Sequence, residues 1–214
     1  MLNTLPLFYF PSTICWVDDD DLFLTAINST FGTHYRCRTF NTPEKALQFF
    51  TSYTPAVAQI ELIRPFTESD LFDTSQHLPV NLNIPAITRL SQMANNLLEI
   101  SLLIIDYSMP RTNGLEICQR LKHLPFKKIL LTGELTNETA LTAFNQGLID
   151  KFIKKDHGIT ETLKSTINAL CDQYFCEQTN HLLIHMETIR KSPLSDPAFC
   201  EFFHTLRQKL NIKE

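Results

Sequence analysis

The sequence has few glycines, only 5 in 214 residues, and none of them belongs to a recognisable phosphate-binding loop. Because neither a Walker loop nor a glycine-rich dinucleotide fingerprint occurs, we expect no nucleotide site of those kinds. No serine, histidine and aspartate set, and no cysteine and histidine set, has the pattern of a nucleophilic hydrolase. The formal net charge of −4 gives no general attraction to nucleic acid or to anionic lipid.

The cysteines lack the paired spacing of a disulfide framework, and we expect reduced thiols in a cytoplasmic protein. They are Cys15, Cys37, Cys118, Cys171, Cys176 and Cys200. No apolar run approaches the length of a membrane span. The apolar segment 1–11 is too short and uncharged for a signal peptide, so we expect it to pack on the domain or on a partner. His181 and His185 have the spacing of a metal pair, but without a third ligand we interpret them as surface residues.

Four short segments carry the strongest pattern in the chain, because each is an apolar run of strand length that ends in a polar residue. They are the segments 14–20, 102–110, 128–133 and 152–154. A run that is apolar throughout is typical of a parallel strand buried on both faces. In an open α/β sheet, ligands bind outside the carboxyl ends of such strands. We therefore expect the polar residues of all four segments to meet at one edge of a sheet.

The residue types at these strand ends suit phosphoryl transfer. Asp106 follows the most apolar run and is the expected nucleophile, since a carboxylate can attack phosphorus and form an aspartyl phosphate. The adjacent carboxylates of Asp18 and Asp19 would repel each other without a cation, and Mg²⁺ prefers such oxygen ligands. The Thr132 hydroxyl and the Lys154 ammonium are expected to hold a phosphoryl oxygen. Phosphoryl transfer depends mainly on this kind of charge neutralisation.

Strands and helices are predicted to alternate along most of the chain. The predicted strands are 14–17, 35–40, 101–105, 128–132 and 151–154; the predicted helices are 22–31, one from 43, 115–124, 137–145, 158–190 and 198–210. This alternation predicts an α/β fold, a doubly wound five-stranded parallel sheet of flavodoxin-like topology in the order 2-1-3-4-5. The predicted core contains Val17, Leu103, Ile104, Ile105, Ile129, Leu130, Leu131, Phe152 and Ile153.

Two parts exceed a simple five-stranded fold. Segment 51–98 adds about forty residues to one strand connection. It contains a predicted helix at 86–98. We interpret the segment either as an elongated helix or hairpin that packs on its own domain, or as an arm that binds a partner. At the C-terminal end, helix 158–190 outlasts what the sheet can cover. Together with helix 198–210, for which Ser195 is the expected N-cap, it forms either a hairpin on its own domain or a dimer arm.

The motifs resemble the receiver domain of two-component response regulators, a CheY-like fold. Residues 17–20 resemble the acidic pair of that family, 109–114 the loop after its phosphorylated aspartate, and 144–150 its approach to the last strand. The resemblance covers residues 12–50 and 99–170. The ending at 144–154 and the long insertion are more loosely similar to the subgroup of a quorum-sensing response regulator of Legionella.

The resemblance implies a role for each matching residue. Asp106 would be phosphorylated by a sensor histidine kinase or a phosphotransfer protein. Asp19, Asp106 and the backbone carbonyl of Ser108 would bind Mg²⁺ directly, and Asp18 through water. Thr132 and Lys154 would hold the phosphoryl group. The protein would be a signalling phosphoacceptor that catalyses only its own phosphotransfer and dephosphorylation, and not an enzyme with a separate substrate.

Several positions depart from the receiver pattern. Lys155 stands where receivers usually have a proline after a cis peptide bond, and because a cis bond before a non-proline residue costs roughly 3 kcal/mol, we expect a trans bond. Lys151 stands where many receivers have an aromatic switch residue. Ser108 and Glu134 occupy variable positions that tune the phosphate lifetime. A carboxylate at Glu134 would either orient water or repel the phosphoryl group.

The sequence therefore predicts a receiver domain over 12–175, including the insertion 51–98, and a helical extension over 176–214. Phosphorylation would draw Thr132 inward and alter the face made by 137–145, 151–154 and the start of 158–190. The expected output is a changed homodimer or partner contact, without direct binding to nucleic acid or membrane. The alternatives are an interaction module independent of phosphorylation, or a receiver fragment of a transcriptional regulator.

Overall fold

The computed structural model describes residues 12–55, 83–85, 88, 99–133, 137–156, 158–186 and 196–210. The strands are β1 (Thr13–Val17), β2 (Arg36–Phe40), β3 (Ile100–Asp106), β4 (Lys127–Thr132) and β5 (Lys151–Lys154). The helices are α1 (Asp21–Phe31), α2 (Pro43–Thr51), α4 (Gly114–Arg120), α5 (Asn137–Asn145), α6 (Ile159–Met186) and α7 (Pro197–Lys209). The chain divides into two compact units, and one of them, Ser12–Pro55 with Leu98–Tyr174, contains the sheet.

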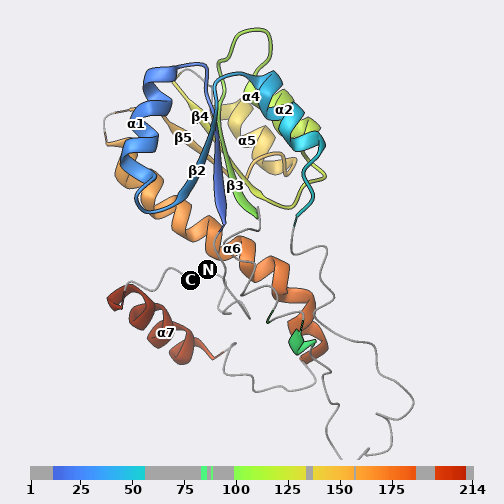
Figure 1. Cartoon of the computed structure of the whole chain (residues 1–214), viewed down its shortest axis with the longest axis vertical. Coiled ribbons are helices and arrows are strands. Elements are labelled where there is room, and N and C mark those ends of the chain that lie inside the picture. The colour runs from blue at the N-terminus through green and yellow to red at the C-terminus, as the bar shows by residue number, and fades with distance from the viewer. Residues whose placement is uncertain are drawn as a thin grey trace, which may run out of the picture. The chain divides into compact units, whose positions relative to one another are not determined.

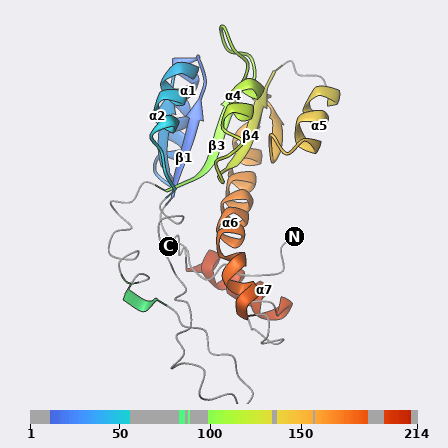
Figure 2. The same ribbon diagram turned by 90° about the vertical axis from the view of Figure 1, so that its right-hand side faces the viewer.

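All five strands form one parallel sheet in the order β2-β1-β3-β4-β5, which confirms the predicted topology. Helices cover both faces: α1 and the first part of α6 lie on one side, and α2, α4 and α5 on the other (Figures 1 and 2). Because β1 and β3 are neighbours and point the same way, their carboxyl ends open onto one edge. The chain order reverses between these two strands, which is where ligands bind in folds of this kind.

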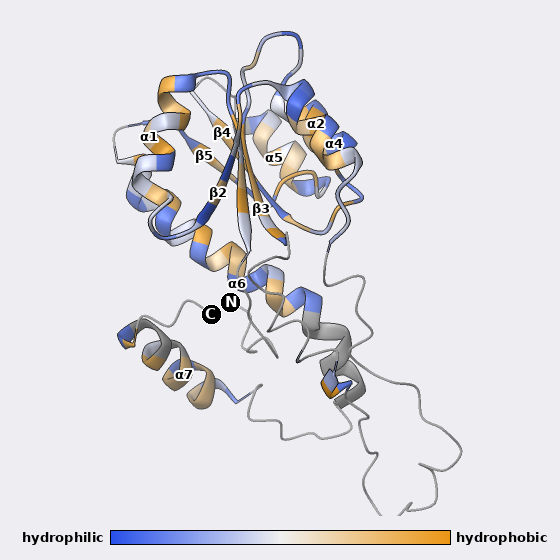
Figure 3. Cartoon of the chain, viewed as in Figure 1, coloured by the Kyte–Doolittle hydropathy of each residue, from blue (hydrophilic) through white to orange (hydrophobic). Residues whose placement is uncertain are grey.

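The core follows the apolar runs of the central strands. Hydrophobic residues run along β3 in the middle of the sheet, whereas β2 at its edge is hydrophilic (Figure 3). One cluster joins the sheet to Phe31 of α1 and to Leu163 and Ile167 of α6. The predicted core is buried with one exception: Phe152 is 38% exposed. It lies on β5, an edge strand with a neighbour on one side only, so its side chain is incompletely covered.

Helix starts are set by capping side chains, and at α7 the cap lies one residue away from the predicted one. Asp20 caps α1 and accepts from the backbone N–H groups of Leu22 and Phe23. Asp196 accepts from the N–H of Phe199 at the start of α7, where Ser195 was predicted. In both cases the acidic side chain that accepts lies three residues before its donor, the spacing that a cap requires.

The buried pair Glu99 and Tyr174 lies at the opposite end of β3 from the acidic residues. Both side chains are fully buried, and the Tyr174 hydroxyl donates to Glu99 Oε1. The backbone around this pair is anchored too, since the Ile100 N–H donates to Tyr53 Oη at 3.0 Å. Burial and the nearby Glu99 charge raise the pKa of Tyr174, so its hydroxyl keeps its proton. The contact therefore ties α6 to the start of β3.

Replacing Tyr174 with phenylalanine should lower the free energy of unfolding by about 1–3 kcal/mol, because it takes one donor from a buried carboxyl group. Urea denaturation measures this loss. The matched control is Tyr35→Phe, which removes an exposed hydrogen bond of 2.7 Å to Asn168 and should cost about 1 kcal/mol or less. Equal losses of unfolding free energy in the two variants would show that the buried Glu99 contact stabilises the protein no more than the exposed Tyr35 contact does.

The remaining predicted elements are only partly within the described residues. Most of the insertion 51–98, the segment 1–11 and the side chains of His181 and His185 lie outside them. Helix α6 is described to Met186 and α7 to Lys209. Phe202 on α7 and Leu210 just beyond it are exposed apolar side chains. Within the described part of the chain, none of the helices combines the length and apolar character that crossing a membrane needs.

Candidate functional site

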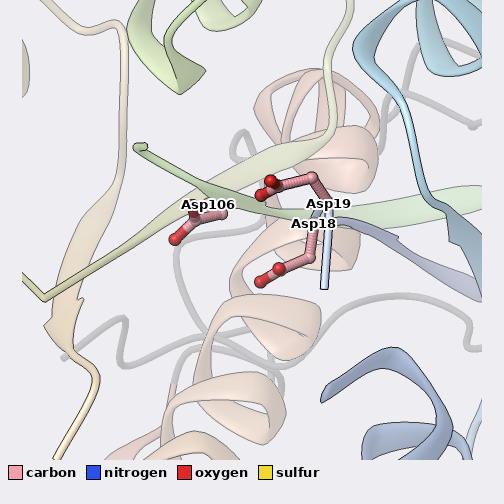
Figure 4. Close-up of side chains that lie close together, drawn as sticks. All are labelled: Asp18, Asp19 and Asp106. Atoms are coloured by element: carbon pink, nitrogen blue, oxygen red, sulfur yellow. The ribbon is translucent and has the colours of Figure 1, made fainter. Parts of the chain in front are cut away.

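Three carboxylates meet at the carboxyl ends of β1 and β3. One ligand oxygen from each of Asp18, Asp19 and Asp106 lies within 4.8 Å of the others. Figure 4 shows the three side chains gathered together, two from the loop after β1 and one from the end of β3. Asp18 and Asp106 are buried, whereas Asp19 is exposed. The structure thus brings together the three acids that the sequence predicted as metal ligands.

The turn after β1 uses its four aspartates in different ways. The Asp18 backbone N–H donates to Phe40 O at 3.1 Å, which continues the ladder between β1 and β2. Asp18 Oδ1 accepts from the Asp20 N–H at 3.0 Å, so the carboxylate is fixed by the turn itself. Asp20 caps α1, and Asp21 Oδ1 accepts from Asn41 Nδ2 at 3.1 Å. Of the run, only Asp18 and Asp19 belong to the cluster with Asp106.

The lysine at this site is Lys155, and not the predicted Lys154. The Lys155 Nζ lies 2.7 Å from Asp18 Oδ2 and 2.7 Å from Asp106 Oδ1. The same ammonium lies 4.7 Å from the centre of the Phe23 ring, within the range of a cation–π contact. Lys154, in contrast, is exposed at the end of β5. The ammonium that contacts the acids therefore belongs to the residue after Lys154, and the predicted role of Lys154 toward a phosphoryl group stays a prediction.

The physical reason is that the backbone stays extended through residue 155. The Lys155 N–H donates to Thr132 O at 2.8 Å, one step beyond the pair Thr132 and Lys154. Side chains alternate along an extended strand, so Lys155 lies on the same side as buried Ile153, and Lys154 on the same side as exposed Phe152. No cis peptide bond occurs among the described residues, which confirms the trans bond predicted before Lys155.

The other predicted site residues differ in burial and in their position on the sheet. Thr132 is buried at the end of β4, next to β3 in the sheet. Ser108 is exposed in the loop that follows Asp106, and Lys151 is exposed at the start of β5. A Cβ atom added at Gly133, which follows Thr132, would meet nothing within 4 Å. Glu134 lies outside the described residues.

The loop between Asp106 and α4 is held close to the strand end. Asn113 caps α4 by accepting from the Glu116 N–H at 2.9 Å. The Gly114 N–H donates to Tyr107 O at 3.0 Å. A Cβ atom at Gly114 would lie 2.3 Å from the carbonyl oxygen of Asp106, so the close approach of these two backbones requires glycine. The sequence motif 109–114 did not by itself reveal this contact.

Burial perturbs both charges in the centre of the site. It raises the pKa of the Asp18 carboxyl above its ordinary value, even though hydrogen bonds from Lys155 and Asp20 oppose the shift. Burial alone would lower the pKa of the Lys155 ammonium, but its hydrogen bonds to Asp106 and Asp18 outweigh burial and raise it. Lys155 therefore keeps its proton. Because burial still disfavours the negative charge of Asp18, an additional cation near this carboxylate would stabilise it.

The raised pKa of Asp18 predicts a stability change for Asp18→Asn. A carboxyl group with a higher pKa in the folded than in the unfolded chain makes the protein less stable as the pH rises from about 3.8 through the folded-state value. At pH 7 without divalent cations, the variant should therefore melt higher than the wild type, by roughly 2–4 °C for each kcal/mol. The difference in melting temperature between Asp18→Asn and the wild type should disappear as the pH approaches about 3.8. A variant that melts lower at pH 7 would contradict the assignment.

The donor set fits Mg²⁺ better than a softer metal. Three carboxylates supply hard oxygen ligands, and Mg²⁺ is usually bound by one or two carboxylates while it keeps several waters. The exposed Asp19 leaves one side of the cluster open to water. The carboxylates of Asp18, Asp19 and Asp106 could hold such an ion. Among the described residues, no other group of three or more such side chains has this arrangement.

Solved structures with the same fold include response-regulator receiver domains. No protein-family model matches the chain, and no curated protein is a significant match. The response regulator LqsR of Legionella pneumophila superposes with a TM-score of 0.73 at 28% identity, covering 98% of this chain and 59% of LqsR. The chain thus spans about three-fifths of the length of that relative.

Two smaller proteins match over most of their own length. A CheY-like receiver domain protein from Methanospirillum hungatei JF-1 has a TM-score of 0.52 at 18% identity, covering 78% of this chain and 98% of its own. The receiver domain of an HD domain-containing protein from Pseudomonas fluorescens Pf-5 has a TM-score of 0.53 at 16% identity, covering 80% and 94%. At these identities the two matches show the fold alone.

These neighbours confirm the resemblance to response-regulator receiver domains that the sequence motifs indicated. The five-stranded parallel sheet in the order 2-1-3-4-5 is the CheY-like, flavodoxin-like arrangement.

Proposed function

We propose that this protein is a response-regulator receiver that accepts a phosphoryl group on Asp106 from a sensor histidine kinase or a phosphotransfer protein. The observation that carries the proposal is the cluster of Asp18, Asp19 and Asp106 at the switch point of the sheet, with a lysine ammonium between two of the three. A nucleophile, a metal-binding acid pair and a fixed cation are the groups that phosphoryl transfer needs.

The proposed reaction assigns a role to each of these groups. Asp106 attacks the phosphorus of a phosphohistidine, the P–N bond breaks, the histidine nitrogen leaves with a proton from solvent, and an acyl phosphate remains on Asp106. Mg²⁺, when bound, neutralises the charge that the oxygens carry. The Thr132 hydroxyl donates to one phosphoryl oxygen, and the ammonium of Lys155, which follows β5, donates to another. The open space beside Gly133 admits the incoming group.

The proposed output is a change in protein contacts. Movement of Thr132 toward the phosphoryl oxygens would alter the face made by α5, β5 and the start of α6. Leu141, Phe144 and Phe152 are exposed apolar side chains on these elements, a composition suited to protein contact. We propose a homodimer or partner switch in the cytoplasm, without direct binding to nucleic acid. The domain limits 12–175 and 176–214 and a role in quorum sensing stay predictions.

A second candidate is an interaction module that works without phosphorylation. The observation that favours it is Lys155, which already compensates Asp18 and Asp106 and could hold the site in one state. A receiver portion of a transcriptional regulator is a variant of the first proposal, consistent with a match that covers only 59% of LqsR.

Incubation with acetyl phosphate tests the proposal without any partner protein. Intact-mass spectrometry should show the gain of one phosphoryl group when Mg²⁺ is present and no gain when EDTA replaces it. Size-exclusion chromatography of the same samples reports whether the phosphorylated fraction changes its oligomeric state. An unchanged mass in Mg²⁺, with an intact fold by circular dichroism, would favour the phosphorylation-independent module.

A further inference from the structure

The start of β3 lies where the chain leaves the sheet unit and returns to it. That unit consists of Ser12–Pro55 and Leu98–Tyr174, so the chain leaves it after Pro55, returns at Leu98 and leaves again after Tyr174. Helix α6 runs from Ile159 to Met186, so the second of these exits lies inside a helix. We call the chain at Pro55 the first exit and the chain at Tyr174 the second exit.

Side chains at both exits are hydrogen-bonded to neighbouring residues at the start of β3. At the second exit, the Tyr174 hydroxyl donates to Glu99 Oε1. At the first exit, the hydroxyl oxygen of Tyr53 accepts from the Ile100 N–H at 3.0 Å. Because Glu99 and Ile100 are consecutive, two segments that are far apart in the sequence are joined to the same point of the central strand.

Further contacts hold the same end of β3. The Ser12 hydroxyl donates to Ser101 Oγ at 2.7 Å, and Ser101 Oγ lies 3.3 Å from Cys171 Sγ on α6. The Thr13 N–H donates to Glu99 O at 2.6 Å. The consecutive residues 99, 100 and 101 are therefore joined to α6, to the segment after α2 and to the start of β1.

This end of β3 is closed to water. Glu99, Ser101 and Tyr174 are completely buried. Burial and the nearby Glu99 carboxyl raise the pKa of the Tyr53 hydroxyl and of the Tyr174 hydroxyl, so both keep their protons. Hydrogen bonds among buried groups reinforce one another, and the loss of one partner costs more than the bond alone contributes. We therefore expect these contacts to hold or open as a set.

We propose that Tyr53, Glu99, Ile100 and Tyr174 form a latch that holds both exits together, so that the chain at the first exit and the continuation of α6 open as one cooperative unit. Local opening in proteins occurs in such units. Because coupling between two sites is reciprocal, a change that loosens one exit should loosen the other. The latch is a conformational device separate from the acidic site, which lies at the opposite end of β3.

Hydrogen–deuterium exchange, measured by mass spectrometry on the intact chain, tests the latch. Tyr53→Phe removes the acceptor of the Ile100 N–H, and Tyr174→Phe removes the donor to Glu99. Each variant should raise exchange about fivefold in residues 50–55 and also in residues 172–178, because one lost buried hydrogen bond favours an opening that both segments share. The response at the exit that carries no substitution is the decisive reading.

Two variants outside the latch serve as controls. Tyr35→Phe removes an exposed hydrogen bond of 2.7 Å to Asn168, which also ties α6 to the sheet unit. Ile129→Val trims a completely buried side chain of β4 and lowers the global stability. Neither control should change exchange at either exit by more than about twofold, because local opening leaves the rest of the unit folded.

A response confined to the exit that carries the substitution would overturn the latch, because it would show two independent hydrogen bonds. An equal rise at both exits in Ile129→Val would also overturn it, since the exits would then open only when the whole unit unfolds. None of these measurements uses phosphorylation, so their outcome is separate from the test of the proposed function.

Discussion

Asp106→Asn should abolish phosphorylation by acetyl phosphate, whatever the Mg²⁺ concentration. The amide of asparagine is a poor nucleophile and cannot form the acyl phosphate. No other described carboxylate has the same surroundings, because only Asp106 is placed by a buried strand next to Asp18, Asp19 and an ammonium. Intact-mass spectrometry should therefore show no added phosphoryl group in the variant, under conditions in which the wild type is modified.

A suitable control is Asp156→Asn, which changes an exposed acid just beyond β5 and outside the cluster. This variant should be phosphorylated to the same extent as the wild type. If Asp106→Asn retained the modification while folded, the phosphoryl acceptor would be a different residue. If both variants lost it, the loss would reflect general charge rather than a particular nucleophile.

Gly114→Val should destabilise the protein by at least about 3 kcal/mol. The first carbon of the new side chain would lie 2.3 Å from the Asp106 carbonyl oxygen and 2.9 Å from Leu130 Cδ1. A backbone oxygen at the end of the central strand cannot move without disturbing the β3–β4 register, so the clash must be relieved by displacing the start of α4. The urea midpoint should fall accordingly, and any folded fraction should accept phosphate poorly, because the Asp106 backbone is displaced.

Gly133→Ala is the matched control, because the added carbon would meet nothing within 4 Å. Its stability should stay within about 0.5 kcal/mol of the wild type. Equal midpoints for Gly114→Val and the wild type would show that the loop after Asp106 is loosely held, and the account of how this loop positions the nucleophile would be wrong.

The sequence predicted the sheet well because its three central strands, β1, β3 and β4, are apolar runs that are buried throughout. The predicted helix 137–145 agrees with α5 residue for residue, and the strand 151–154 agrees with β5. The first helix ends at Phe31, before Gly32, as predicted. By contrast, the predicted helix 115–124 is shorter in the structure, where α4 ends at Arg120 and turns follow. An apolar stripe fixes the buried face of a helix, but its last turn depends on tertiary contacts.

The acidic part of the site was predictable, and its cation was not. Asp18, Asp19 and Asp106 each follow an apolar run, and parallel strands bring such ends together. The choice between Lys154 and Lys155 depends on whether the backbone stays extended for one more residue, and two consecutive lysines carry no signal about this. A trans bond before Lys155 allows the backbone to stay extended at this residue. Because an extended strand sends alternate side chains to opposite faces, Lys154 and Lys155 then point in opposite directions.

The close approach of Gly114 to Asp106 was also missed, because it joins two backbones rather than two side chains. Phe152 was predicted to be buried from its apolar character alone. Its position on an edge strand becomes clear only from the order of the sheet. Most of the insertion 51–98 lies outside the described residues, so its predicted helix stays a prediction.

The most direct measurement is to locate the modified residue after incubation with acetyl phosphate and Mg²⁺. Reduction with borohydride converts an aspartyl phosphate to homoserine, and peptide mass spectrometry then identifies the position. We expect homoserine at residue 106 when Mg²⁺ is present and none when EDTA replaces it. Homoserine at another aspartate, or a modified protein without any homoserine, would contradict the claim that Asp106 is the phosphoryl acceptor.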